Sequence, residues 1–212
     1  MSAFEGRYRQ IVEGGLPGWF AEEHYAELTA HWRDRLTPQI AAGARILEVG
    51  CGVGKLAASL VAMGYEVVGV DISETAITLA RRSVSDAKFE VANIGSALPF
   101  PEGEFDVVLD SDCLHHLHGA ARTNFLGESA RVLRDAGLLL VKTNVGEPPL
   151  EHHEMLGYDP GTRTSRRDGE IVNYYASAEE VLGELEAAGY RLDRVEHSGE
   201  ANAQLLVDAI RG

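Results

Sequence analysis

Three alternating glycines follow an acidic residue at the end of an apolar run: Gly50, Gly52 and Gly54 come after Glu48. Glycine adopts positive φ and has no side chain, so a strand-to-helix turn made of these residues can bring its backbone amides against a ligand. Asp71 ends the next apolar run, where a carboxylate can accept hydrogen bonds from a ribose diol. The glycine turn and Asp71 together predict a site for a nucleotide-type cofactor.

The charge of Glu48 bears on which cofactor this turn can hold. Gly52, Gly54 and Ala57 have the spacing of a dinucleotide fingerprint, which would place a pyrophosphate here. Like charges about 4 Å apart cost about 4 kcal/mol at an effective dielectric of about 20, so an ionised Glu48 opposes a diphosphate. S-adenosylmethionine has no phosphate and carries a sulfonium and an α-ammonium. A nicotinamide oxidoreductase is therefore the weaker alternative.

Five stretches of the chain form a longer pattern, and they are residues 48–54 (EVGCGVG), 67–73 (VVGVDIS), 93–100 (NIGSALPF), 105–117 and 131–141. Together they resemble the class I S-adenosylmethionine-dependent methyltransferases, from about Arg45 to the end of the chain. Two positions depart from the family. Asn93 stands where the family often has an aspartate for the adenine amino group, and Asp135-Ala136 replaces the usual Pro-Gly turn. An amide oxygen can still accept a hydrogen bond from an amine.

The resemblance implies an α/β fold, with a doubly wound, mostly parallel seven-stranded sheet that ends in an antiparallel hairpin. It implies S-adenosylmethionine as the cofactor and S-adenosylhomocysteine as the product. The cofactor residues expected from it are Glu48, Gly50, Cys51, Gly52, Gly54, Asp71, Ile72, Asn93, Ile94, Asp110 and Ser111.

Acidic and histidine residues gather after the fourth expected strand: Asp112, His115, His116 and His118. Methyl transfer is an in-line displacement that needs close placement of the acceptor, and most acceptors must also lose a proton. A histidine that titrates near neutrality is the natural base. Adjacent residues on a starting helix diverge by about 100°, so one of His115 and His116 should face the acceptor. We predict His116 as the base, with His115 and Asp112 as further catalytic candidates.

A metal site competes for these residues. Asp110, Asp112 and the three histidines, with His152 and His153 from a later segment, offer enough ligands for a divalent ion. Their spacing is diagnostic neither of zinc nor of a facial triad, so we predict no metal. A metal-assisted methyltransferase and a non-catalytic domain that binds S-adenosylmethionine remain the alternatives.

Short apolar strands alternate with helical patterns, as in a doubly wound parallel sheet. The expected strands are 45–49, 66–71, 88–92, 105–110, 137–143, 190–196 and 203–210. The last two are too close in sequence for a parallel crossover and should pair antiparallel. A capping box, Ser177 to Glu180, predicts the start of a helix that Gly189 ends.

Two segments lie outside this scaffold and should determine specificity. Residues 1–43 are expected to form an N-terminal helical lid, and residues 44–212 the methyltransferase domain with an insertion at about 144–175. Tyr25 and Trp32 share a helix face and are interpreted as core contacts. The residues expected to bind the acceptor are Tyr8, Trp19, His152, His153 and Tyr174.

Composition limits the classes of partner. The 212 residues are 45% hydrophobic and 25% charged, as in one globular domain. The net charge of −14 opposes docking on nucleic acid, and no stretch resembles a signal peptide or a membrane span. Two cysteines do not make a disulfide framework. We expect a cytoplasmic enzyme that methylates an N, O or C atom of a small molecule; the sequence leaves the oligomeric state open.

Overall fold

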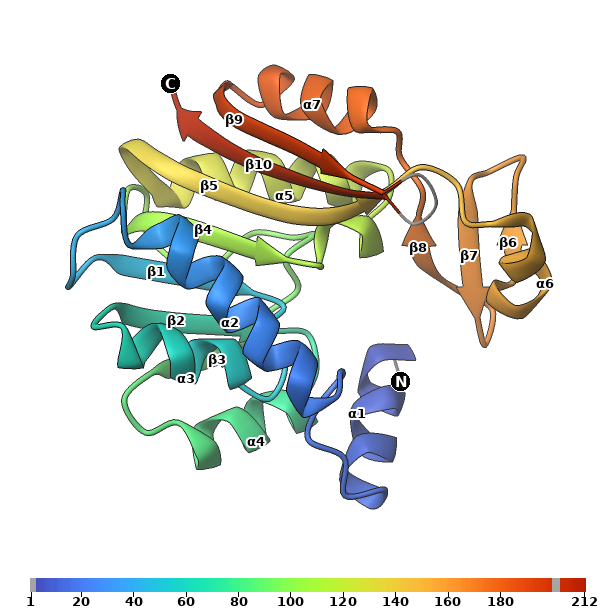
Figure 1. Ribbon diagram of the computed structural model, residues 1–212, viewed down its shortest axis with the longest axis horizontal. Helices are drawn as coiled ribbons and strands as arrows, with labels where there is room; N and C mark the ends of the chain where they lie inside the picture. The colour runs from blue at the N-terminus through green and yellow to red at the C-terminus, as the bar shows by residue number, and fades with distance from the viewer. Residues whose placement is uncertain (1–2, 200–202) are drawn as a thin grey trace.

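The computed structural model describes residues 3–199 and 203–212 and contains a seven-stranded sheet. Its strands are β1 (Arg45–Val49), β2 (Glu66–Asp71), β3 (Lys88–Val91), β4 (Phe105–Ser111), β5 (Leu133–Val145), β9 (Tyr190–Ser198) and β10 (Ala203–Arg211). The spatial order is β3-β2-β1-β4-β5-β10-β9 (Figure 1). The first five strands are parallel, and β10 pairs antiparallel with both β5 and β9. The predicted fold class and terminal hairpin are confirmed.

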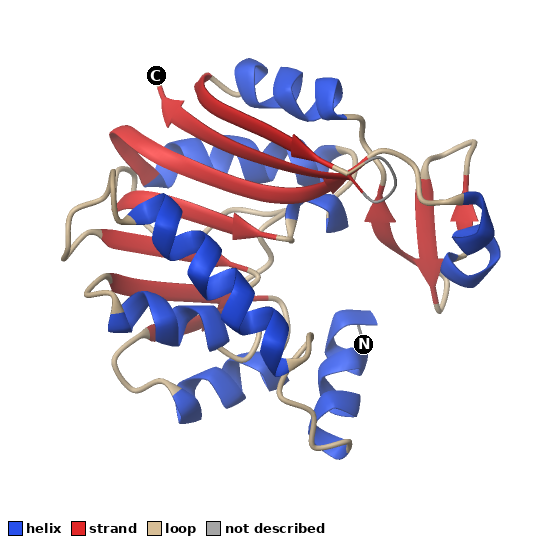
Figure 2. Ribbon diagram, in the orientation of Figure 1, coloured by secondary structure: helices blue, strands red, loops and turns tan. Residues whose placement is uncertain are grey.

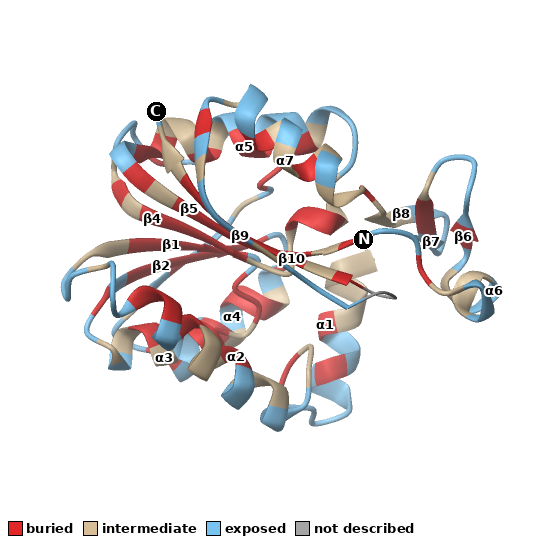
Figure 3. Cartoon of the chain, turned by 45° about the horizontal axis from the view of Figure 1, so that its top comes forward, coloured by how far each residue is buried: buried red, intermediate tan, exposed pale blue. Residues whose placement is uncertain are grey.

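Helices cover both faces of this sheet (Figure 2). They are α2 (Glu22–Leu36), α3 (Lys55–Ala62), α4 (Glu74–Ser83), α5 (Ala120–Val132) and α7 (Ala178–Ala187), whereas α1 (Ala3–Glu13) lies beyond the strand ends and packs on α4. Side chains alternate along a strand, so Leu47 faces the layer of α5 and α7 whereas Ile46 faces α2 and α3. The sheet therefore separates two apolar cores, and its central strands β1, β2 and β4 are almost continuously buried (Figure 3).

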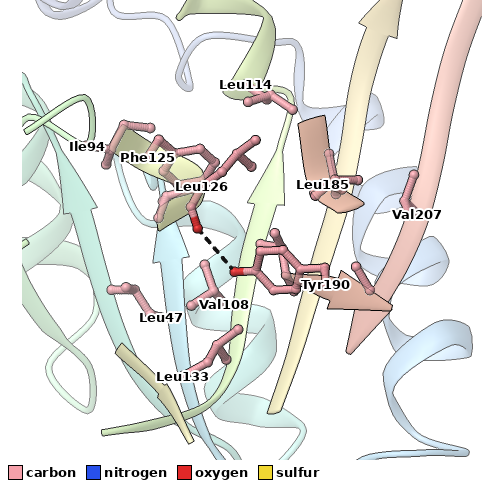
Figure 4. Close-up of a cluster of buried hydrophobic side chains, with 14 of the residues drawn as sticks. Leu47, Ile94, Val108, Leu114, Phe125, Leu126, Leu133, Leu185, Tyr190 and Val207 are labelled. Carbon is pink, nitrogen blue, oxygen red and sulfur yellow. Dashed lines mark hydrogen bonds between the residues drawn. The ribbon is translucent and has the colours of Figure 1, made fainter. Parts of the chain in front are cut away.

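The core beneath α5 and α7 is closed by aromatic side chains. Phe105 and Phe125 are fully buried, and the Tyr190 hydroxyl donates to the Leu126 carbonyl at 3.5 Å (Figure 4). Helix α7 begins with the predicted capping box, in which the Ser177 side chain accepts from the Glu180 amide. This core fixes β4 and β5, whose carboxyl ends lie beside the site described below.

Helix α2 packs as part of the main body. Trp32 and Leu36 have no exposed surface, and the Trp32 indole donates to the Ser111 hydroxyl at 3.1 Å. Buried Arg35 donates to the Asp208 carboxylate of β10 at 2.6 Å. We therefore place α2 with the scaffold, although the sequence analysis grouped it with the lid.

Strand β5 is longer than predicted: it runs from Leu133 to Val145, whereas the expected strand was 137–143. The expected turn at Asp135-Ala136 appears inside it as an irregularity, with Ala136 at a φ of 57°. Gly137 follows, and a Cβ there would lie 2.8 Å from the Arg134 carbonyl oxygen. The Pro-Gly turn of the family is thus replaced by a bend that puts an alanine in the left-handed region.

The insertion folds into an accessory unit that the sequence analysis did not predict. Strands β6 (Tyr158–Asp159), β7 (Thr164–Arg167) and β8 (Glu170–Tyr174) form a separate antiparallel sheet. The 3₁₀ turn η2 (Leu150–His152) and the short helix α6 (His153–Leu156) precede it. Figure 1 shows this unit projecting beyond the carboxyl ends of the parallel strands, on the side where α1 lies. No described helix is long and apolar enough to cross a membrane.

Candidate functional site

A cavity of about 450 Å³ opens at the carboxyl ends of the parallel strands. Ligands of open α/β sheets bind at this edge, because the loops that leave the strands meet there. The turn after β1, the end of β2 and the 3₁₀ turn η1 (Leu114–His116) form one part of the wall. Helix α1, the start of α2, β8 and the first residue pairs of β10 with β5 form the rest.

The glycine turn has the conformation that its sequence predicts. Gly50 and Gly52 have φ values of 66° and 54°, which favour glycine over other residues. A Cβ on Gly50 would lie 2.8 Å from the Cys113 sulfur, and one on Gly52 would lie 2.7 Å from the Tyr8 hydroxyl. Side chains are thus excluded both by the backbone and by space, and the turn presents bare peptide to the cavity.

Asp71 joins this turn to the end of β2. Its carboxylate accepts from the Gly52 amide at 3.0 Å and from the Ser73 amide at 2.9 Å. Burial raises the pKa of Asp71, and the two amides oppose that shift. A carboxylate oxygen can accept more than one hydrogen bond. Each oxygen of Asp71 can therefore still accept from a ligand hydroxyl in the cavity that Asp71 lines.

Glu48 is a buried carboxyl group on the cavity wall. It is 4% exposed, and its Oε2 has no hydrogen-bond partner among the described residues. Burial raises the pKa of Glu48 to about 8, and the neighbouring charge of Asp71 adds to the shift. An uncompensated buried acid of this kind is stabilised by a ligand that brings positive charge. A cationic cofactor would lower this pKa and stabilise the ionised carboxylate, whereas a diphosphate would keep Glu48 protonated.

Most of the expected cofactor residues line the cavity: Glu48, Gly50, Cys51, Gly52, Asp71, Ile72, Asn93, Ile94 and Ser111. Gly54 does not, because it begins α3 and packs against Ala80 and Phe89. Asp110 is also set back: it has no exposed surface, and its carboxylate accepts from the Cys113 amide at 2.8 Å. Both residues shape the turns behind the site.

Asn93 lies in the loop after β3, where the resemblance places the adenine contact. Its Oδ1 accepts from the Gly95 amide at 2.9 Å, which holds the loop. The same oxygen keeps a second lone pair, so it can still accept from an amino group.

His115 and His116 both line the cavity, with ring centroids 4.2 Å apart. His115 is buried, and its two nitrogens lie 3.3 Å from the Thr143 hydroxyl and 3.5 Å from the Asn144 amide nitrogen. Burial lowers the pKa of His115 well below its usual value. Its imidazole is therefore neutral and engaged at both nitrogens.

His116 has a defined tautomer. Its Nδ1 lies 2.7 Å from the Val172 carbonyl oxygen, which can only accept, so Nδ1 carries the proton. The neutral ring then keeps a lone pair on Nε2. Burial lowers the pKa of His116, while hydrogen bonds to the Val172 carbonyl and to the Asn173 side chain oppose the shift. Of the two histidines, His116 has the geometry of a base.

Asp112 lines the cavity in a strained conformation, with a φ of 69°. Its carboxylate forms an ion pair with Lys142 of β5, and both side chains are almost buried. The charge of Asp112 is thereby compensated. His118, the fourth member of the predicted group, is exposed and does not line the cavity.

Three of the five predicted acceptor residues line the cavity, namely Tyr8, Trp19 and Tyr174. His152 and His153 do not, because they belong to the turn and short helix that precede the accessory sheet. His153 contacts the Pro148 carbonyl oxygen at 3.0 Å and packs on the Tyr158 ring. These two histidines support the accessory unit.

Several lining residues escaped the sequence analysis. Tyr25, interpreted there as a core contact, lines the cavity with Phe4 and His24, and the Phe20 amide approaches the Tyr25 hydroxyl at 3.3 Å. Asn144, Asn173 and Gln204 line it from three different strands. Phe4 could have been identified from the other aromatic residues of the N-terminal segment, which lie on either side of the Gly14–Gly18 stretch. The amides had no local signal, because strand pairing alone brings them together.

In the part of the chain that the structure describes, no three His, Cys, Asp or Glu side chains are grouped so that they could hold a metal ion. The two cysteines there are free thiols.

Comparison with known proteins locates a family domain within the chain. Residues 47–141 match the methyltransferase domain family. A probable S-adenosylmethionine-dependent methyltransferase of Mycobacterium tuberculosis is 38% identical over 109 residues, which are 51% of this chain and 38% of that protein. A ubiquinone biosynthesis O-methyltransferase of Ruegeria is 28% identical over 170 residues, 79% of this chain and 67% of that protein. The chain thus spans well under half of the length of the Mycobacterium relative.

Solved structures share the fold. A protein from Pyrococcus horikoshii superposes with a TM-score of 0.74 at 23% identity, covering 89% of this chain and 91% of that one. The 1,6-didemethyltoxoflavin-N1-methyltransferase of Burkholderia thailandensis, solved with bound 1,6-didemethyltoxoflavin and S-adenosylhomocysteine, gives a TM-score of 0.71 at 20% identity. That likeness covers 98% of this chain and 87% of the other.

Proposed function

Because the chain belongs to the class I S-adenosylmethionine-dependent methyltransferases, we propose that it transfers a methyl group from S-adenosylmethionine to a small molecule bound beside His116. The observation that carries the proposal is the unpartnered, buried Glu48 beside the bare Gly50–Gly52 peptide. A cationic, phosphate-free ligand would lower the pKa of Glu48 and pair with its carboxylate, whereas a diphosphate would gain no such attraction from this side chain.

Each end of the cofactor has residues that suit it. Asp71 would hold the ribose hydroxyls, Asn93 and Ile94 would edge the adenine, and Glu48 would compensate the positively charged end. Bound there, S-adenosylmethionine supplies an electrophilic methyl group on a sulfonium. Tyr8, expected at the acceptor, lies with its hydroxyl next to Gly52, so we assign it to the cofactor side of the cavity.

The chain's own contribution is placement and proton removal. The cavity would hold the acceptor lone pair in line with the methyl group, which would be transferred while the electrons of the broken sulfur–carbon bond stay on sulfur as a thioether lone pair. The acceptor proton passes to Nε2 of His116, whose lowered pKa keeps the ring neutral and ready near pH 7. Holding the two reacting atoms at near-attack distance supplies several kcal/mol more.

We further propose a lid, limited to α1 and the Gly14–Gly18 turn, because α2 is built into the core. Phe4 and Tyr8 of α1 line the cavity, and Glu5 of the same helix accepts from Ser73 and Thr75 at the start of α4. Closure of this helix would exclude water from the cavity. The absence of nucleic-acid partners remains a prediction from the acidic composition, and a cytoplasmic location remains a prediction from the sequence.

Two relatives favour a ring-containing acceptor. One is the ubiquinone biosynthesis O-methyltransferase, and another, from Tropheryma whipplei, is a demethylmenaquinone methyltransferase that is 32% identical over 117 residues. The assays described below distinguish the metal-assisted and non-catalytic alternatives from the proposed function.

Isothermal calorimetry tests the cofactor assignment. S-adenosylmethionine should bind the parent, and Asp71→Ala should lose about tenfold or more in affinity, because charge-assisted hydrogen bonds contribute about 1.5–3 kcal/mol each. Asp86→Ala removes an exposed carboxylate and is the matched control. Since Asp71 also holds Gly52, Asp71→Asn with an unchanged melting temperature separates binding from folding. Unchanged affinity in both variants, or tighter binding of NADH by the parent, contradicts the assignment.

A further inference from the structure

The acceptor side of the cavity carries a continuous strip of uncharged polar groups. Gln204 of β10 is the register partner of Asn144 of β5, so their side chains emerge from the same face next to each other. The Asn144 amide nitrogen lies 3.5 Å from His115, whose ring centroid is 4.2 Å from that of the tilted His116 ring. Asn173 of β8 completes the strip: its amide nitrogen donates to the Ser165 hydroxyl at 3.0 Å, and its side chain also bonds to His116.

An aromatic wall meets this strip at His116. The Phe4 and Trp19 rings lie 5.1 Å and 6.4 Å from the His116 ring, and 6.2 Å from each other. Tyr174, which follows Asn173, also lines the cavity. Flat apolar walls with a polar edge bind a planar ring whose substituents reach the edge.

The charges of the cavity limit what that ring can carry. No Lys or Arg among the described residues lines it, so a carboxylate or phosphate on the acceptor would have no cation in direct contact. Arg7 lies behind the wall, 5.9 Å over the Trp19 ring. Asp112 also lines the cavity, but its carboxylate is already paired with Lys142. Glu48 and Asp71 belong to the turn of the proposed cofactor. A cationic acceptor therefore also lacks a free counter-charge.

We infer that the acceptor is an uncharged, planar hydroxyarene whose ring lies against Phe4 and Trp19 and whose polar substituents bond to the carboxamides of Asn144, Asn173 and Gln204. The inference rests on the proposed methyl transfer and names its substrate class. Carboxamides both donate and accept, so they match neighbouring hydroxyl and carbonyl groups on one ring. The hydroxyl that attacks the methyl group gives its proton to His116, and its oxygen, still bonded to the ring, carries the new methyl group.

Three matched probes test the class: 3,4-dihydroxybenzamide, 3,4-dihydroxybenzoate and dopamine, which carry a neutral, an anionic and a cationic substituent on the same dihydroxyarene. Methyl transfer from isotope-labelled S-adenosylmethionine is measured by mass spectrometry. We expect kcat/KM for the neutral amide to exceed the values for both charged probes at least tenfold. Equal or greater transfer to the carboxylate or the amine overturns the inference.

A one-atom change locates the recognition. Gln204→Glu puts a carboxylate into the strip and should lower kcat/KM for the neutral probe at least tenfold relative to dopamine. Gln10→Glu makes the same change on the exposed face of α1 and should leave the ratio unchanged. An unchanged ratio in Gln204→Glu contradicts a role for this residue in acceptor recognition.

Calorimetry separates this inference from the proposed function. A chain that binds S-adenosylmethionine but methylates none of the three probes contradicts the hydroxyarene class and leaves the methyltransferase assignment standing. A chain that does not bind S-adenosylmethionine contradicts both.

Discussion

The two halves of the cavity are built differently. The cofactor half consists of backbone turns at the ends of adjacent parallel strands, where Glu48 of β1 pairs in register with Gly69 of β2. The acceptor half consists of side chains from segments far apart in the chain, such as Phe4, His116 and Gln204. The first half depends on conformation over a few residues, whereas the second depends on how distant elements pack. Changes in each half should therefore have separable effects.

The largest expected effect is on turnover, in the acceptor half. His116→Ala should lower kcat about a hundredfold or more, since general bases contribute about 10² to 10⁴. Affinity for S-adenosylmethionine should be nearly unchanged, because the cofactor half keeps its backbone. Rate measurements and calorimetry on the same preparation check both numbers, and His118→Ala, at an exposed position outside the cavity, is the control.

Retention of full activity in His116→Ala would leave positioning alone as the source of rate. The same assay with a chelator addresses the metal-assisted alternative. EDTA should have no effect, and activity that is lost in EDTA and restored by a divalent ion would assign Asp112 and the histidines to a metal.

An intermediate effect is expected where α1 bridges the halves. Burial raises the pKa of Glu5, but hydrogen bonds from Ser73, Thr75 and Arg9 outweigh it and lower the pKa to about 2. A carboxylate with a depressed pKa stabilises its contacts above its ordinary value of 4.5 and loses that contribution as the pH falls toward about 2. Docking of α1 should thus weaken across this window.

Glu5→Gln should remove the charge from these bonds and raise hydrogen exchange at residues 3–13 about tenfold at pH 7, because a bond to a charged group contributes about 1.5–3 kcal/mol. Glu13→Gln, at the exposed end of α1, is the control. Exchange that is equal in Glu5→Gln and the parent would show that the apolar contacts of Ile11 hold α1 alone.

The smallest expected effect is on the free energy of unfolding, at a residue outside both halves of the cavity. Ala136 has a φ of 57°, which costs a residue with a Cβ about 1–2 kcal/mol. Ala136→Gly should raise the free energy of unfolding by about 1 kcal/mol, after the greater entropy of unfolded glycine is counted. Ala58→Gly, on the exposed face of α3, should lower it by about 1 kcal/mol. Denaturant titration measures both, and a destabilised Ala136→Gly would contradict the strain argument.

The central parallel strands β1, β2 and β4 could be predicted from sequence because each is a largely apolar run that a turn follows. Strands β1 and β2 begin and end at the predicted residues. The glycine turn could be predicted for the same reason, since positive φ at Gly50 and Gly52 is a local property. The position of Asp71 at the end of the next strand predicted its ribose role, and the family resemblance supplied the role of Asn93.

The accessory sheet could not be predicted in this way. Strand β7 reads Thr-Ser-Arg-Arg, which has no apolar alternation, and its pairing with β8 contains a register shift. Gln204 becomes a cavity residue only because β10 pairs with β5 at Asn144. His152 and His153 have the right chemistry for an acceptor site, but a short turn directs them to the accessory unit. Position in the fold, and not residue type, decided these cases.

The buried pair of Arg35 and Asp208 sets an order on folding. The two residues are 173 positions apart, and leaving one buried charge unpaired costs several kcal/mol. As the chain emerges from the ribosome, α2 is made early, yet its arginine meets no carboxylate from β10 until almost the whole domain has been synthesised. Helix α2 should consequently dock late, with the face that carries Trp32 open to chaperones in the meantime.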